Sequence, residues 1–218
     1  MHIPKRFFIS GTDTDVGKTM VSAILALGLP AAYWKPIQCG NEPASDSQWL
    51  ASVGVDQKFI LPERYNLRNP LSPHRAAELE GVSISLDDFE LPKNSAEYVI
   101  VEGAGGLMVP LNAKDMVIDL VAKLQLPLLL VARSGLGTIN HTVLSIQALH
   151  QKEIPLIGVV MNGEPNPANR AAIEHYGKTK VLAEIPPIAQ INKDSILQAY
   201  NESFGLKSKS SNPAAATT

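Results

Sequence analysis

Residues 11–19 read GTDTDVGKT, and this stretch decides the fold of the chain. An apolar run at residues 7–10 precedes it, and residues 20–27 follow with the composition of a helix. A strand, a glycine-containing loop, Gly-Lys-Thr and a helix are the parts from which proteins build a cradle for polyphosphates. In such a cradle the N–H groups of the loop and the positive end of the helix face the anion. The stretch therefore predicts a binding site for a nucleoside triphosphate.

Two side chains of this loop have clear chemical tasks. Lys18 would reach the β- and γ-phosphates, and the hydroxyl of Thr19 would hold Mg²⁺. The spacing is a variant, because five residues separate Gly11 from Gly-Lys-Thr where the common pattern has four. The alternative is an ordinary strand-to-helix turn that contains Gly-Lys-Thr, and the combination of strand, glycine-containing loop, Gly-Lys-Thr and helix disfavours it.

The composition is that of an ordinary globular protein. The chain has 218 residues, of which 45% are hydrophobic and 18% charged, and this length can bury a substantial core. Its net charge of −2 gives no reason to expect a nucleic-acid partner. No apolar stretch approaches the roughly 20 residues of a membrane span, and the start of the chain does not resemble a signal peptide. The single cysteine, Cys39, excludes an internal disulfide. We expect a cytoplasmic protein that binds neither nucleic acid nor membrane.

Short apolar runs alternate with helical segments after residue 97. The expected strands are residues 7–10, 32–35, 98–101, 128–131, 156–161 and 181–185. The expected helices are residues 20–27, 46–52, 73–80, 86–89, 115–124, 139–152 and 168–176. Continuous apolar runs of this length are typical of parallel strands that are buried on both faces. The pattern predicts an α/β fold, a doubly wound and mainly parallel sheet of the P-loop NTPase type, as a single domain over residues 1–206. Residues 207–218 lack core-forming side chains, and we expect them to be disordered.

Ligands of doubly wound sheets bind beyond the carboxyl ends of the strands. Glu102 follows one expected strand and precedes a glycine-rich turn, where an acid supports Mg²⁺ in phosphate-loop enzymes; the alternative is that it caps the turn. Asp46 is a second candidate acid, with a helix N-cap as its alternative role. Lys35 closes another expected strand and would neutralise developing phosphoryl charge, or would be a solvated cation.

Two further strand ends carry binding candidates. Gly137 and Thr138 open a helix whose free N–H groups favour a carboxylate or a phosphate, and Thr138 would alternatively be its N-cap. Asn162 lies where its amide would pair with the edge of a purine. The chain lacks an Asn-Lys-x-Asp guanine signature, which favours ATP over GTP. We expect His141 to be a packed residue and not a base.

Taken in order, these motifs resemble the ATP-dependent dethiobiotin synthetases of biotin biosynthesis. The loop at residues 11–19 is similar to that of the family almost letter for letter, and VEGAGG at residues 101–106 is a second specific match. Shorter matches follow at residues 35–38, 72–74, 137–141, 158–162 and 184–186. The resemblance spans residues 7 to about 190.

The resemblance implies a ligase that converts 7,8-diaminopelargonate, CO₂ and ATP into dethiobiotin, ADP and phosphate, with Mg²⁺. A carbamate forms on the diamine and attacks the γ-phosphate of ATP. The second amine then closes the ring on the carbamic-phosphoric anhydride. The resemblance also implies a homodimer with its site at or near the interface.

The resemblance transfers roles to the matching residues. Lys18, Lys35 and Thr14 would be catalytic, and Thr19, Asp46 and Glu102 would coordinate Mg²⁺. The nucleotide would contact Asp15, Val16, Gly17, Lys18, Thr19, Met20, Asn162, Ile185 and Pro186. The diamine substrate would contact Thr14, Lys35, Cys39 and Gly105, and its carboxylate would be bound across the interface by Gly137, Thr138, Ile139 and Asn140.

The chain departs from the family pattern at a few positions. Cys39 stands where a serine or threonine is expected, so a hydroxyl contact is lost or weakened. The first crossover, residues 27–32, is short. A tyrosine that reaches into the partner's site in some members falls at Ile173, Glu174 or Tyr176.

Three alternatives share such a loop. Amidoligases of the cobyrinic-acid type carry a second, glutamine-hydrolysing domain, and the single cysteine of this chain lies in the wrong neighbourhood for one. A ParA/MinD-like switch ATPase has an extra lysine in the loop, where this chain has Asp13 and Asp15. An inactive binding module is disfavoured because the lysines and acids of the site are all present.

Overall fold

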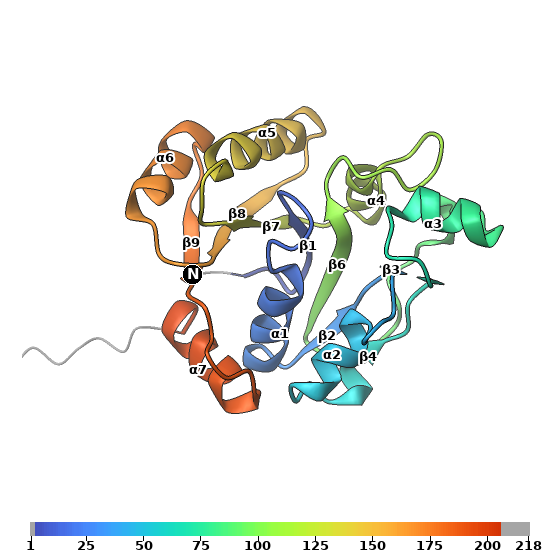
Figure 1. Ribbon diagram of the computed structural model, residues 1–218, viewed down its shortest axis with the longest axis horizontal. Helices are drawn as coiled ribbons and strands as arrows, with labels where there is room; N and C mark the ends of the chain where they lie inside the picture. Colours follow the sequence, from blue (N-terminus) through green and yellow to red (C-terminus); the bar gives the residue numbers. More distant parts are fainter. Residues whose placement is uncertain (1–2, 206–218) are drawn as a thin grey trace, which may run out of the picture.

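The computed structural model describes residues 3–205 as a central parallel sheet with helices packed on it (Figure 1). The order of its seven strands is β4-β2-β6-β1-β7-β8-β9, and every pairing among them is parallel. The strands are β1 (Arg6–Gly11), β2 (Ala31–Trp34), β4 (Ile60–Leu61), β6 (Tyr98–Gly106), β7 (Leu128–Arg133), β8 (Leu156–Asn162) and β9 (Val181–Ile185). The predicted doubly wound sheet is confirmed, with β1 at its centre.

Helices cover both faces of the sheet. Phe7 and Ile9 of β1 join one apolar cluster and Phe8 joins the other, as expected for alternating side chains of a strand. The first face is covered by α1 (Lys18–Gly28), α2 (Asp46–Ser52) and α7 (Lys193–Ser203). The second is covered by α3 (Pro73–Glu80), α4 (Val117–Leu124), α5 (Thr138–Gln151) and α6 (Pro167–Gly177). Burial on both sides explains why the strands read as continuous apolar runs.

The strand β6 is longer than the sequence predicted. Residues 102–106, which we expected to form a turn, continue the strand, and Gly106 pairs with Gly11 of β1. Glycine permits this close approach, because a Cβ atom on Gly103 would lie 2.8 Å from the ring of Phe8. Glu102 therefore lies within the sheet, and its alternative role as a turn cap is wrong.

Several elements were not predicted. A small second sheet pairs β3 (Ile37–Cys39) with β5 (Tyr65–Leu67), where the sequence suggested a loop. The short helix expected at residues 86–89 is a 3-10 turn, Leu86–Asp88, and a second such turn spans Gln57–Phe59. The helix α7 was also missed, because its outer face is polar and only Ile196 and Ala199 are buried.

The last helix packs directly on the helix that follows the phosphate loop. A Cβ atom on Gly28 of α1 would lie 2.1 Å from the ring of Tyr200 of α7. None of the helices between residues 3 and 205 is long and apolar enough to cross a membrane. The expected disordered tail, residues 207–218, lies outside the described residues, and the single-domain assignment stays a prediction.

Candidate active site

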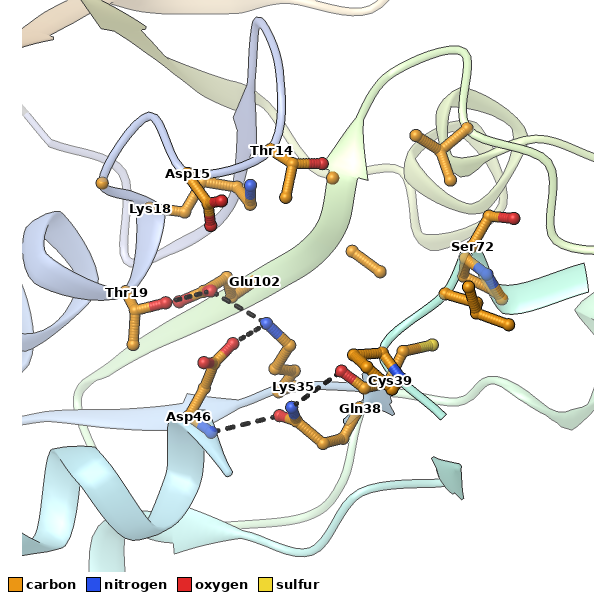
Figure 2. A pocket seen from close by; sticks show the side chains of 17 residues that line it. Thr14, Asp15, Lys18, Thr19, Lys35, Gln38, Cys39, Asp46, Ser72 and Glu102 are labelled. Atoms are coloured by element: carbon orange, nitrogen blue, oxygen red, sulfur yellow. Dashed lines mark hydrogen bonds and ion pairs between the residues drawn. The ribbon is translucent and has the colours of Figure 1, made fainter. Parts of the chain in front are cut away.

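A cavity of about 800 Å³ lies between the phosphate loop, the carboxyl end of β2, β6 and the starts of α2 and α3 (Figure 2). It brings together many of the side chains that the sequence predicted. The predicted residues that line it are Thr14, Asp15, Gly17, Lys18, Thr19, Lys35, Cys39, Asp46, Glu102 and Gly105. Pro70, Leu71, Pro73 and Val109 form an apolar wall of the same cavity. The cavity therefore combines charged groups with an apolar surface.

The phosphate loop has a conformation that requires glycine at its end. Gly17 has a φ of 95°, and a Cβ atom there would lie 2.2 Å from the amide nitrogen of Asn162. Lys18 follows as the first residue of α1; it is buried and its Nζ donates to the carbonyl oxygen of Asp13 at 3.2 Å. The carboxylate of Asp13 accepts a hydrogen bond from the backbone N–H of Thr14 and pairs with Arg133. Lys18 therefore lies where the phosphate loop passes into α1, and its ammonium contacts the loop itself.

Glu102 accepts hydrogen bonds from four side chains of the site. It is fully buried, yet each of its oxygens accepts two hydrogen bonds. The donors to Oε1 are Thr19 Oγ1 at 3.0 Å and Lys35 Nζ at 3.1 Å. The donors to Oε2 are Ser22 Oγ at 2.6 Å and the Tyr33 hydroxyl at 3.1 Å. This network compensates the carboxylate for the loss of water.

Lys35 joins the two candidate acids. Its buried ammonium contacts Glu102 and also pairs with Asp46, so that it lies between the two carboxylates (Figure 2). Asp46 is the first residue of α2, and Ser45 is the residue that caps this helix. The N-cap alternative for Asp46 is therefore wrong, and so is the solvated-cation alternative for Lys35.

Burial and charge act against each other at these groups. Burial lowers the pKa of Lys18, although the charge of Glu102 opposes this shift. Burial also raises the pKa of Glu102, but Lys35, the Ser22 hydrogen bond and Lys18 together bring it below its ordinary value. Glu102 is therefore ionised at neutral pH, and the lysines and the Ser22 hydroxyl around it compensate its charge.

The donors at this site fit Mg²⁺ chemically. Hydroxyl and carboxylate oxygens are the ligands that Mg²⁺ prefers, and Thr19, Asp46 and Glu102 all line one cavity. Within residues 3–205 there is no group of three or more His, Cys, Asp or Glu side chains arranged for a metal. A magnesium ion here would therefore depend on Thr19, nucleotide phosphates and water as further ligands. The metal assignment stays a prediction.

The predicted nucleotide residues outside the cavity form a group beside the loop. Asn162 donates from its amide to the carbonyl oxygen of Val16 at 3.2 Å, and it pairs with Ile185 across β8 and β9. Ile185 is fully buried, Pro186 is exposed and Met20 is half-buried. None of these five residues lines the cavity. Their contact with a purine stays a prediction.

The residues predicted to bind the substrate carboxylate also lie elsewhere. Gly137, with a φ of 89°, is the N-cap of α5, so the N-cap alternative for Thr138 is wrong. Neither Gly137 nor Thr138, Ile139 or Asn140 lines the 800 Å³ cavity. A second cavity of about 410 Å³ lies between α5 and the phosphate loop, and Thr14 lines both cavities. His141 also lines it, and its buried Nδ1 has no hydrogen-bond partner among the described residues.

Sequence reasoning missed several residues of the site. Ser22, Tyr33 and Gln38 are buried within its hydrogen-bond network, and none was predicted. Strand alternation was an available signal for Tyr33, because residues two apart in a strand share a face and Lys35 was already a candidate. Helical spacing was a comparable signal for Ser22, which lies three residues after Thr19, and Gln38 lies in the matched stretch 35–38.

Cys39 is expected to react slowly with alkylating reagents. Burial raises the pKa of its thiol to about 11, although Lys35 opposes the shift. The thiolate fraction near neutral pH is then about 100-fold below that of a thiol with the ordinary pKa of 9.0. Mass spectrometry of iodoacetamide labelling should show a native rate that keeps rising up to about pH 11, whereas the urea-unfolded chain should level off near its ordinary pKa. Superimposable pH profiles for the two states would contradict this expectation.

The fold and the phosphate loop define a nucleotide-binding protein of the P-loop class. A family model described as an AAA domain matches residues 5–195. The ATP-dependent dethiobiotin synthetase of Paramagnetospirillum magneticum is 50% identical over 189 residues, covering 87% of this chain and 91% of that relative. The enzyme of the same name from Bradyrhizobium diazoefficiens is 43% identical over 201 residues, covering 92% and 95%. The chain belongs to the ATP-dependent dethiobiotin synthetase family.

Solved structures show the same fold at low identity. A plasmid partition protein from Borrelia burgdorferi bound to AMPPNP superposes with a TM-score of 0.54 at 12% identity, covering 94% of this chain and 93% of that one. The MinD cell division protein of Aquifex aeolicus gives 0.52 at 14% identity, covering 93% and 98%. At this identity the likeness extends to the fold alone.

Proposed function

We propose that this chain is an ATP- and Mg²⁺-dependent ligase that forms dethiobiotin from 7,8-diaminopelargonate and CO₂, with release of ADP and phosphate. The observation that carries the proposal is the cavity in which the phosphate-loop lysine, Lys18, meets Lys35, Asp46 and Glu102. Family membership supports the same reaction, because the relatives are named for it.

The lysines suit the charge problem of this reaction. A carbamate formed by attack of a substrate amine on CO₂ is an anion, and it must approach the anionic γ-phosphate of ATP. Lys18 and Lys35 line the same cavity and would hold carbamate and phosphoryl oxygens in line. Carbamate oxygen then bonds to phosphorus as ADP leaves, and the second amine attacks the carbamoyl carbon as phosphate leaves. Bound Mg²⁺ would neutralise phosphate charge.

The walls of the cavity suit a substrate with one polar and one aliphatic part. The cavity is lined by the charged groups Lys18, Lys35, Asp46 and Glu102 and also by the apolar residues Pro70, Leu71, Pro73 and Val109. We propose that the amines lie between Thr14, Lys35 and Cys39, near Gly105, and that the alkyl chain follows the apolar wall. Proximity of a held nucleophile can recover on the order of 7–11 kcal/mol of the barrier.

A homodimer is part of the proposal. Met108 and Leu144 are exposed large apolar residues that line the second cavity, Leu136 is exposed just before α5, and a partner subunit would cover them. The start of α5 would then supply its N–H groups to the substrate carboxylate. Among the positions considered for a partner-reaching tyrosine, Ile173 is buried and Glu174 accepts a hydrogen bond from Val181, whereas Tyr176 is exposed. We therefore propose Tyr176 for that position, in a cytoplasmic enzyme.

The test is ADP formation by purified protein with Mg²⁺ and ATP. Turnover is expected only when both 7,8-diaminopelargonate and CO₂ are present, and mass spectrometry should then detect dethiobiotin. Matched reactions without the diamine, and in CO₂-depleted buffer, are the controls. ATP hydrolysis that is indifferent to both would contradict the proposal and favour a switch ATPase.

A further inference from the structure

The carboxylate of Glu102 divides its two oxygens between different surroundings. Oε1 accepts hydrogen bonds from Thr19 and Lys35, and both of these side chains line the 800 Å³ cavity. Oε2 accepts hydrogen bonds from Ser22 at 2.6 Å and Tyr33 at 3.1 Å. Ser22 and Tyr33 are fully buried and do not line the cavity. One oxygen therefore belongs to the site, and the other is held by the interior of the protein.

The four donor side chains come from two elements, two from the end of β2 and two from α1. Tyr33 and Lys35 are two residues apart at the end of β2 and so lie on the same face of the sheet, while Trp34 packs on the opposite face. Ser22 lies three residues after Thr19 in α1, so these two also share a face. Each element thus gives one donor to Oε1 and one to Oε2. The orientation of Glu102 is fixed by the same strand and helix that carry the site.

We propose that Tyr33 and Ser22 are positioning residues, which hold Oε2 of Glu102 so that Oε1 points to Thr19, Lys35 and the magnesium-bound nucleotide. The terminal torsion of a glutamate side chain is otherwise broad. Two hydroxyl donors on one oxygen restrict it. Partners that orient a metal-binding group typically change metal affinity or activity by about 10–100-fold when they are removed. The inference rests on the proposed role of Glu102 at the metal.

Tyr33→Phe is the variant that tests this role, because it removes only the hydroxyl. The Mg²⁺ concentration for half-maximal turnover is expected to rise about tenfold, with a smaller loss of kcat. Calorimetry with AMPPNP should show a similar weakening of nucleotide binding in the presence of Mg²⁺ and no change in its absence. Ser22→Ala should act in the same direction. Tyr200→Phe is the matched control, because no hydrogen bond of the Tyr200 hydroxyl occurs within residues 3–205, and it should behave as wild type.

The two readouts separate this inference from the proposed function. Wild-type Mg²⁺ dependence in both Tyr33→Phe and Ser22→Ala would overturn it, even if the protein makes dethiobiotin. Weaker Mg²⁺-dependent binding of AMPPNP in these variants would support it, even if the wild-type protein makes no dethiobiotin. If Tyr33→Phe does not fold, as judged by thermal unfolding, Ser22→Ala alone decides.

Discussion

Lys18→Ala is expected to lower ATP turnover by about 10²–10³-fold, the usual effect of removing one donor that stabilises charge in a transition state. Lys18 is the cation of the phosphate loop, and it is buried at the floor of the cavity. Its Nζ donates to the carbonyl oxygen of Asp13 at 3.2 Å, within the loop that would surround the phosphates. A coupled assay of ADP release, with saturating diamine and bicarbonate, measures the loss.

This loss should not come from unfolding. Burial lowers the pKa of Lys18, which means that the folded state holds its ammonium at a cost. The variant should therefore unfold at a temperature equal to or slightly above that of the wild type. Lys114→Ala removes an exposed lysine from a loop away from the cavity and serves as the control. Turnover of Lys18→Ala within about twofold of the control would contradict the assigned role.

Lys35→Met is expected to cost about 3–5 kcal/mol of unfolding free energy, because it leaves a buried carboxylate without its counter-ion. Lys35 is buried and Glu102 is fully buried, and the two are paired, so the variant removes the cation that contacts this carboxylate. The same variant should also lose turnover, since Lys35 lines the cavity. Urea denaturation at neutral pH, followed by circular dichroism, measures the stability.

A second substitution separates this effect from simple loss of packing. Lys35→Met combined with Glu102→Gln removes the uncompensated charge and should recover most of the lost stability. Lys5→Met, which breaks the exposed pair of Lys5 with Glu97, should cost about 1 kcal/mol or less. A Lys5→Met loss equal to that of Lys35→Met, or no recovery in the double variant, would contradict the argument.

The pH dependence of Lys35→Met has a defined sign. In the wild type the pKa of Glu102 is below the ordinary 4.5, so its stabilising contribution is present above pH 4.5 and is lost as the pH falls through the folded pKa. In Lys35→Met burial raises the pKa of Glu102, because its cation is gone. Protonation at low pH then removes the buried charge, and with it the loss of stability that this charge causes. The stability gap between the two proteins should therefore narrow as the pH falls toward and below 4.5.

The parts of the fold that follow from local pattern were predicted well. Strand β9 and helices α2 and α3 have the predicted bounds, because apolar runs and caps define them locally. The grouping of Lys18, Lys35 and Glu102 also followed from the sequence, since the carboxyl ends of parallel strands meet at one edge, and Asp46 was placed with them through the family resemblance. The separation of α5 from the main cavity could not be predicted from the sequence, because it depends on how helices pack across the sheet.

The hydrogen-bond partners of Glu102 could not be predicted from the sequence. Gly103, Gly105 and Gly106 suggested a turn, but β6 continues through them, and Gly106 pairs with Gly11 of β1. An acid inside a sheet is stable only when donors from other elements reach it, and Ser22 and Tyr33 come from elements about 70–80 residues away in the chain. Local spacing relates Tyr33 to Lys35 and Ser22 to Thr19, but it does not show that these side chains reach Glu102.

The central position of β1 also determines when the site can form during protein synthesis. Within residues 3–205, β1 precedes the other strands in the chain, but its two neighbours, β6 and β7, end only at Gly106 and Arg133. The packing of α1 is completed later still, because Tyr200 of α7 packs against it at Gly28. The phosphate loop thus comes early in the sequence, but the sheet that holds it is complete around β1 only when residues up to Arg133 have been synthesised.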